Sequence, residues 1–132
     1  MKKNIMTEWV GELRSDKYKQ GPFLLKQKDE NGTLQHCCLG VLCELYQSEM
    51  KKNKKKQLDE DLDNSGDAAA YSFDQNETTL PEAVRDWSGL HDCDGGGGFP
   101  NTTGFTSLAD MNDRGASFET IANFIEKEWE KL

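Results

Sequence analysis

The chain has 132 residues, of which 16 are Lys or Arg and 24 are Asp or Glu, giving a formal net charge of −8 at pH 7. This length fits one hydrophobic core, so residues 1–132 are predicted to form a single domain. The acidic balance argues against general nucleic-acid binding, because contacts with phosphates need a basic face. No apolar run approaches the roughly 18 residues of a membrane span. No hydrophobic run follows the N-terminal lysines either, so we expect a cytoplasmic protein with no membrane partner.

The first predicted element is a short amphipathic helix over residues 5–14. Its apolar residues recur at i, i+3, i+4 and i+7 and are Met6, Trp9, Val10 and Leu13. Asn4 is the expected N-cap of this helix. Two strands are predicted next, at 23–27 and 33–37. The Asn-Gly pair between them supplies the positive-φ positions of a hairpin turn.

Residues 38–50 are predicted to form the central helix of the fold. At helical period, the residues that are not large and apolar form one narrow stripe of Gly40, Glu44, Gln47 and Ser48. The rest of the helix surface is apolar, so other elements are expected to cover it.

The segment after the central helix is strongly charged. Lysines dominate 51–56 and acidic residues follow, so 51–67 is predicted to be a charged, mobile linker. Residues 68–73 fit a strand or a short helix equally well. A capping box from Thr79 to Glu82 predicts a third helix, which Gly89 closes.

The C-terminal part begins with a Gly-rich loop at 92–104, which lacks the lysine of a phosphate-binding loop. Thr106 is the expected cap of a short helix, and Ser117 is the expected cap of the last helix. The apolar face of that last helix is Phe118, Ile121, Ala122, Ile125 and Trp129. The predicted class is α+β, with about four helices packed around one central helix and a small antiparallel hairpin or sheet.

Two functional interpretations of the cysteines are zinc binding and nucleophilic catalysis. Cys38 and Cys43 lie about 140° apart around a regular helix and cannot share one metal, and the chain has no Cys-x-x-Cys pair. Cys38 is at a helix start, where a thiol's pKa falls, but no acidic motif holds His36 as its base. We therefore expect reduced core thiols, no metal, no cofactor and no catalytic residue. A Cys-dependent enzyme or a zinc-binding module is the third hypothesis.

The loop 14–21 brings basic, aromatic and amide side chains together. Its lysines and arginine can bind an anion, its tyrosine can stack on a ring, and its glutamine can form hydrogen bonds. The turn 112–115 can add an amide and a guanidinium from another loop. The predicted ligand-binding residues are Arg14, Lys17, Tyr18, Lys19, Gln20, Asn112 and Arg114. The alternative interpretation is ordinary surface charge between a helix and a strand.

Three motifs are similar, in their order along the chain, to those of a small family of bacteriophage and prophage proteins. They are Tyr-Lys-Gln-Gly at 18–21, His-Cys-Cys-Leu-Gly-Val-Leu-Cys at 36–43 and Asn-Asp-Arg-Gly-Ala-Ser-Phe at 112–118. The resemblance spans nearly the whole chain. That family is functionally uncharacterised, so the resemblance implies no catalytic residues.

A phage setting implies a role against host defence for a small acidic protein without catalytic motifs. The first hypothesis is a non-enzymatic accessory protein that sequesters an anionic nucleotide-derived signal, such as a cyclic nucleotide or a cyclic ADP-ribose, in the host cell cytoplasm. A homo-oligomer is expected, because pockets around small anions are readily built at subunit interfaces. The second hypothesis is an acidic inhibitor or nucleic-acid mimic that binds a host defence protein through its acidic surface, 59–67 included.

Overall fold

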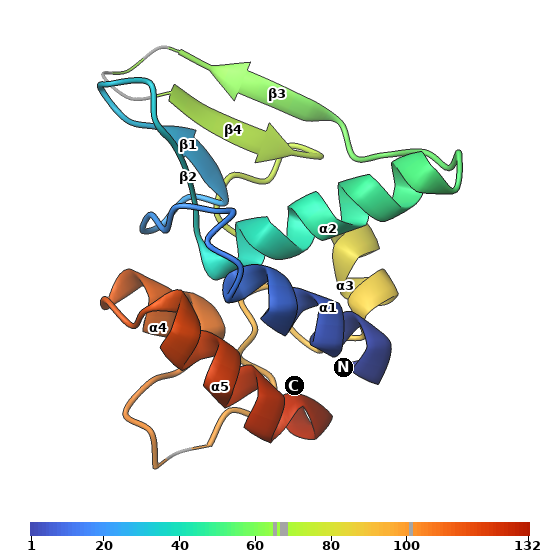
Figure 1. Ribbon diagram of the computed structural model, residues 1–132, viewed down its shortest axis with the longest axis vertical. Coiled ribbons are helices and arrows are strands. Elements are labelled where there is room, and N and C mark those ends of the chain that lie inside the picture. The colour runs from blue at the N-terminus through green and yellow to red at the C-terminus, as the bar shows by residue number, and fades with distance from the viewer. Residues whose placement is uncertain (65, 67–68, 101) are drawn as a thin grey trace.

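The computed structural model describes residues 1–64, 66, 69–100 and 102–132. Within these ranges the chain forms five α-helices, one short 3₁₀ helix (η1) and a four-stranded antiparallel sheet. The sheet lies on one side of helix α2, and helices α1, α4 and α5 lie on the other (Figure 1). The predicted α+β class is therefore confirmed. The elements are α1 Lys3–Leu13, β1 Lys26–Lys28, β2 Leu34–His36, α2 Cys38–Lys52, β3 Glu60–Asp63, β4 Ala69–Phe73, α3 Glu82–Ser88, α4 Leu108–Asp113, α5 Phe118–Glu128 and η1 Trp129–Lys131.

Helix α2 is the central helix, as its apolar circumference predicts. Its first six residues, 38–43, are all buried. The indole N–H of Trp9 in α1 donates to the carbonyl oxygen of Cys38 at 2.9 Å, which ties α1 to the start of α2. A Cβ at Gly40 would overlap the carbonyl oxygen of Leu25. Glycine therefore allows the chain leading into β1 to cross α2 at this point.

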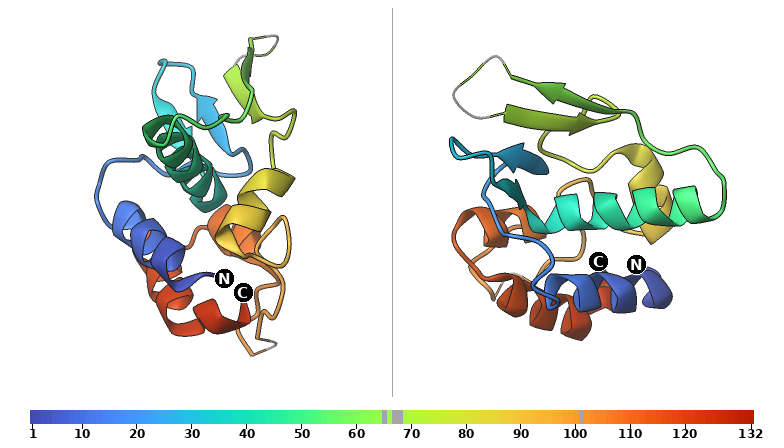
Figure 2. Two further views of the ribbon diagram at one scale, coloured as in Figure 1. Left: turned by 90° about the vertical axis from the view of Figure 1, so that its right-hand side faces the viewer. Right: turned by 45° about the horizontal axis from the view of Figure 1, so that its top comes forward.

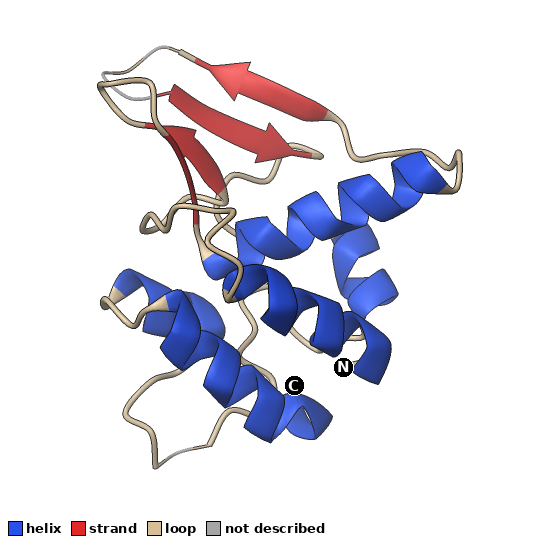
Figure 3. Cartoon of the chain, in the orientation of Figure 1, coloured by secondary structure: helices blue, strands red, loops and turns tan. Residues whose placement is uncertain are grey.

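The strand order is β2-β1-β4-β3, so β2 and β3 are the edges of the sheet. Side chains alternate between the two faces of a strand, and directly paired residues share a face. His36 pairs with Lys26, and Leu62 pairs with Tyr71, over whose ring Lys26 lies. These side chains therefore point to the sheet face nearest α2, which we call the inner face. Figure 3 shows the sheet and the helices in separate colours.

Three predicted helix caps differ from the structure. Asn4 lies inside α1, and Lys2 is at the cap position. The backbone N–H of Lys2 donates to the carbonyl of Ser88, which fixes the chain at the start of the helix. The cap of α3 is Pro81 rather than Thr79, since the N–H of residue 80 bonds to residue 93 and keeps the segment extended. Ser107, not Thr106, caps α4 and accepts the N–H of residue 110. Ser117 caps α5, and Gly89 closes α3 with a φ of 79°; both were predicted.

Two strand predictions also need correction. Part of the predicted linker 51–67 is strand β3, which pairs with β4 along its whole length. The sequence gives no sign of it because three of its four residues are acidic, and only the pairing supplied by the fold makes it a strand. The first strand begins at Lys26 rather than residue 23, because Phe23 has a φ of 68° and is outside the β region. The undecided segment is strand β4, Ala69–Phe73.

The described residues of the Gly-rich loop 92–104 form turns and no helix or strand, as predicted. Residues 65 and 67 of the predicted linker, residue 68 of the undecided segment 68–73 and residue 101 of this loop lie outside the described residues. The two chain ends lie side by side (Figure 2), and the Met1 amino group donates to the carbonyl of Leu132 at 3.3 Å. None of the described helices has the length and apolar character needed to cross a membrane.

Candidate functional site

A hollow of about 290 Å³ lies between the loop after α1, the strand β2 and one face of α2. We call it the Tyr18 hollow. Three of the predicted ligand-binding residues contribute to its wall, together with residues of β2 and α2. The lining residues are Lys17, Tyr18, Lys19, Leu34, His36, Glu44 and Ser48.

His36 is the most unusual group of this wall. It is only 4% exposed, and neither ring nitrogen has a hydrogen-bond partner among the described residues. Its Nε2 lies 3.8 Å from Oε2 of Glu44, and the Tyr18 ring meets it edge-on with the ring centres 4.9 Å apart. Burial, with a smaller effect of Lys26, lowers the pKa of His36 to about 4. The ring is therefore neutral at pH 7 and presents one donor and one acceptor, which a buried polar group normally satisfies.

Lys26 and two carboxylates form a charged cluster beside the histidine. The Lys26 Nζ lies 3.3 Å from Oε1 of Glu60 and 3.7 Å from Oε1 of Glu44, and it stands 4.6 Å from the centre of the Tyr71 ring. Burial raises the pKa of Glu44, against the opposing effect of Lys26. Lys26 is therefore held by acidic partners and contributes little free positive charge to the hollow.

The free positive charge of the Tyr18 hollow comes from the loop after α1. Lys19 is exposed and has no ion pair among the residues that the structure describes, and Lys17 has only a distant one, 4.0 Å from Glu12. Burial, with smaller effects of Glu44 and Glu12, raises the pKa of Tyr18 to about 12. Tyr18 is therefore a neutral aromatic wall between two cations.

Arg14 does not reach this hollow. Its guanidinium faces α5, where it lies 3.1 Å from Oε2 of Glu126 and 3.5 Å from Oε1 of Glu119, and it donates to Oδ1 of Asn123 at 2.6 Å. The structure thus places the first residue of the predicted set in a contact between α1 and α5.

Gln20 and Asn112 are joined in an internal network. The Gln20 amide donates to Oδ1 of Asn112 at 2.9 Å and to the carbonyl of Ala116 at 2.7 Å, and its oxygen accepts the N–H of Phe118. Asn112 Oδ1 also accepts the first N–H of α2, that of Cys38, at 3.2 Å. These two side chains therefore connect the loop, the central helix and the α4–α5 turn.

Arg114 lies apart from the other predicted residues. It donates to the carbonyl of Gly104 at 2.9 Å, and its guanidinium stands 4.9 Å from the centre of the Phe105 ring. The structure therefore brings together Lys17, Tyr18 and Lys19 and separates the other four residues from them.

Sequence reasoning missed the contribution of α2 and β2 to the hollow. Glu44 and Ser48 belong to the narrow polar stripe of the central helix, and their i, i+4 spacing puts them on one side of it. The sequence shows this polar stripe, but it does not show that the loop 14–21 packs beside it. His36 was considered only as a metal ligand or a base, and its burial depends on the loop that crosses β2.

The thiols are poorly suited to nucleophilic chemistry. Cys37, Cys38 and Cys43 are buried, Cys93 is half-buried, and all four are free. Burial raises the pKa of Cys37 to about 11 and that of Cys38 well above its usual value, which outweighs the helix-start effect. Nowhere in the described parts of the chain do three or more His, Cys, Asp or Glu side chains come together as a metal site.

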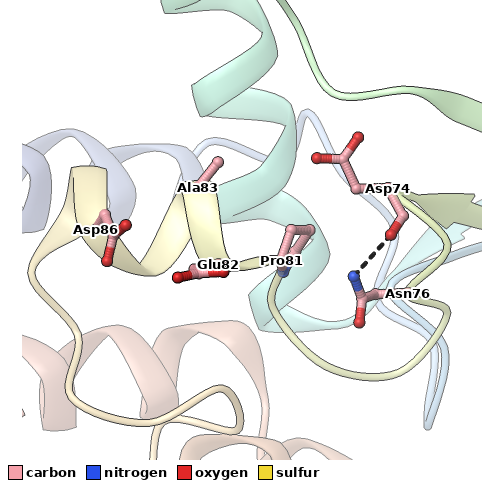
Figure 4. A pocket seen from close by; sticks show the side chains of 6 residues that line it. All are labelled: Asp74, Asn76, Pro81, Glu82, Ala83 and Asp86. Carbon is pink, nitrogen blue, oxygen red and sulfur yellow. Dashed lines mark hydrogen bonds between the residues drawn. The ribbon is translucent and has the colours of Figure 1, made fainter.

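A larger hollow, of about 490 Å³, lies between the turn after β4 and the start of α3 (Figure 4). It is lined by Asp74, Asn76, Pro81, Glu82, Ala83 and Asp86, and the Asn76 amide donates to the backbone carbonyl of Asp74 at 3.0 Å. All of its charged side chains are acidic. It would therefore repel an anion, and the anion-binding hypothesis belongs to the Tyr18 hollow.

Comparison with known proteins places the chain in a family. No curated protein and no solved structure matches it. One family model, described as a domain of unknown function (DUF8296), matches residues 1–129, nearly the whole chain. The chain therefore belongs to the DUF8296 family.

Proposed function

We propose that this protein binds and sequesters a small anionic, nucleotide-like ligand in the Tyr18 hollow. The observation that carries the proposal is His36, which lines the hollow and whose two buried ring nitrogens have no hydrogen-bond partner among the described residues. Lys17 and Lys19 would bind a phosphate, Tyr18 would contact a base or ribose, and His36 would exchange hydrogen bonds with a polar edge. The volume of about 290 Å³ is near the lower end of ligand pockets, roughly 300–1,000 Å³. The volume of the Tyr18 hollow therefore fits one nucleotide unit.

The chemistry of the wall favours binding over conversion of the ligand. A general base works best with a pKa near the operating pH, whereas burial holds the pKa of His36 at about 4. The thiols of α2 are kept protonated by burial. We therefore propose a non-enzymatic protein.

The proposed setting is that of a phage-type accessory protein in the host cytoplasm, which removes a defence signal such as a cyclic nucleotide or a cyclic ADP-ribose. Lys17 and Lys19 are exposed at the mouth of the hollow, so one side of a ligand would stay open to water. In the homo-oligomer that we propose, a second copy covers this side.

The test is ligand capture and release. The purified protein is incubated with a panel of nucleotides and cyclic nucleotides, freed of excess ligand and heat-denatured, and the released compounds are identified by mass spectrometry. Recovery of an intact compound supports sequestration. A converted product would overturn the non-enzymatic proposal, and no uptake from the panel would overturn the ligand class.

Two variants locate the site. Lys19→Ala should weaken binding about 10-fold or more, because a charge-assisted contact is worth about 1.5–3 kcal/mol. Lys52→Ala is the matched control, since it removes an exposed lysine at the far end of α2. Equal effects of both variants would indicate a nonspecific charge effect.

A second function is favoured by the acidic edge of the sheet. Strand β3 is exposed at all four residues, three of which are acidic, and the N–H of Asp59 before it bonds to Asp74 of the acidic hollow. An inhibitor or nucleic-acid mimic of a host defence protein would use such a surface. Pull-down of a nucleic-acid-binding host protein that is lost on Asp61→Lys, with nucleotide capture unaffected, would support it.

A further inference from the structure

The inner face of the sheet continues the Tyr18 hollow beyond its rim. The ligand that we infer for this continuation rests on the proposed function. Leu34 of β2 lines the hollow and is directly paired with Lys28 of β1. Both side chains therefore lie on the inner face. On the other side of β2, the N–H of His36 bonds to the carbonyl of Lys19 at 2.9 Å. The strand β2 is thus flanked by one lysine on each side.

Neither of these flanking lysines is neutralised by a neighbour. Lys28 and Lys19 form no ion pair with any other residue in the described ranges, in contrast to Lys26, which two carboxylates hold. Lys28 is half-buried and Lys19 is exposed. Lys19 contributes to the wall of the Tyr18 hollow, and Lys28 lies on the inner face beside Leu34, so two cations without an acidic partner stand next to β2 in a chain with a net charge of −8.

The exposed side chain of Leu34 lies between the two lysines. Leu34 is 42% exposed, so the inner face of the sheet is open to a ligand at this point. Neighbouring strands lie about 4.8 Å apart, so the backbones that carry Lys19 and Lys28 are separated by about 10 Å across β2. In spatial order across β2, the residues are therefore a cation (Lys19), an apolar side chain (Leu34) and a second cation (Lys28).

From this geometry we infer that the ligand carries two separate phosphate groups, one in the Tyr18 hollow at Lys19 and one beyond its rim at Lys28. The sugar or base that joins them covers Leu34. The class of ligand is a dinucleotide-type compound, linear or cyclic, rather than a mononucleotide or a compound with two adjacent phosphates. Lys28 is then a specificity residue that senses the second phosphate.

The experiment compares AMP, ADP and the linear dinucleotide pApA, with their guanine counterparts, by calorimetric titration of the full chain. AMP carries one phosphate, ADP two adjacent ones, and pApA two that are separated by a nucleoside. We expect pApA to bind at least 10-fold more tightly than AMP and ADP. We expect Lys28→Ala to remove that advantage while the affinity for AMP stays unchanged, and Lys28→Arg to retain it.

The controls separate the two proposals. Lys19→Ala should weaken all three ligands, Lys52→Ala none, and the melting temperature of each variant shows that it is folded. If AMP binds but pApA gains nothing, or if Lys28→Ala weakens AMP and pApA equally, the two-phosphate inference is wrong and the proposed function stands. If no compound of either base binds, the proposed function fails and this inference fails with it.

Discussion

Replacing Asn112 tests whether the Gln20–Asn112 network holds the fold together or serves a ligand. The Asn112 oxygen accepts the N–H of Cys38 at 3.2 Å, and its amide donates to the carbonyl of Gly21 at 3.0 Å; both bonds are buried. Asn112→Ala removes both partners at once. The first turn of α2 then has a buried N–H without an acceptor, and the loop has a carbonyl without a donor.

The structure sets the size of the expected effect. Each buried group that loses its partner costs about 1–3 kcal/mol, so the loss of two partners in Asn112→Ala should lower the free energy of unfolding by about 2–6 kcal/mol. The matched control is Asn53→Ala at the other end of α2. Asn53 also donates two hydrogen bonds, to the carbonyl and the carboxylate of Glu49, but both are exposed. Surface changes of this kind stay within about 0.5 kcal/mol.

Urea unfolding followed by tryptophan fluorescence measures both variants, since Trp9 is fully buried against α2. Asn112→Asp adds a second comparison, because it keeps an acceptor for Cys38 and places a carboxylate against the carbonyl of Gly21. It should therefore also destabilise. A loss below about 1 kcal/mol for Asn112→Ala, together with lost nucleotide binding, would refute the structural role and return Asn112 to the ligand site.

Three further predictions concern pH, packing and the limits of the site. The pKa of His36 falls from 6.5 unfolded to about 4 folded, so its contribution is complete above pH 6.5 and is lost as the pH falls toward 4, by up to about 3 kcal/mol. The urea midpoints at pH 7 and pH 4.5 should therefore differ less for His36→Gln than for wild type, and an equal shift of the midpoint in both proteins would contradict this. Gly40→Ala should prevent stable folding, because its Cβ would overlap the backbone that leads into β1. Gly11→Ala, with open space around its Cβ, should instead stabilise α1 by about 0.5–1 kcal/mol. Similar melting temperatures for the two variants would disprove the close crossing at Gly40. Arg14→Ala should leave nucleotide binding in the Tyr18 hollow intact and lower stability only slightly, because exposed ion pairs contribute little. Lost binding at unchanged stability would instead place Arg14 in the site.

The parts of the fold that local pattern determines were predictable. The central helix follows from an apolar circumference that only other elements can cover, and Ser117 caps α5 because its side chain reaches the N–H of residue 120 without help from the rest of the chain. Thr79 offers the same local chemistry and does not cap α3. The bond between residues 80 and 93 fixes its backbone, and no local pattern reports a contact of that kind.

The candidate site was predictable only where its residues are neighbours in the sequence. Lys17, Tyr18 and Lys19 are neighbours in sequence and therefore neighbours in the hollow. Arg14 is close in sequence to them but projects from the end of a helix toward α5, and this direction depends on where α5 packs. The role of His36 in the wall of the hollow could not be predicted, because a buried ring without a hydrogen-bond partner in the described ranges is a property of the packed structure rather than of the residue type.

The acidic composition argues more strongly against nucleic-acid binding than against binding of a small anion. A long polyanion runs past many surface carboxylates, whereas one or two phosphates meet only the groups within reach. At physiological salt a charge is screened over about 8 Å, so distant carboxylates contribute little at the mouth of the Tyr18 hollow, where Lys17 and Lys19 lie. The same screening means that binding should weaken with added salt, and more strongly if Lys28 engages a second phosphate in addition to the two lysines at the hollow. A steeper salt dependence for wild type than for Lys28→Ala with the same pApA ligand would therefore indicate that Lys28 contacts a phosphate.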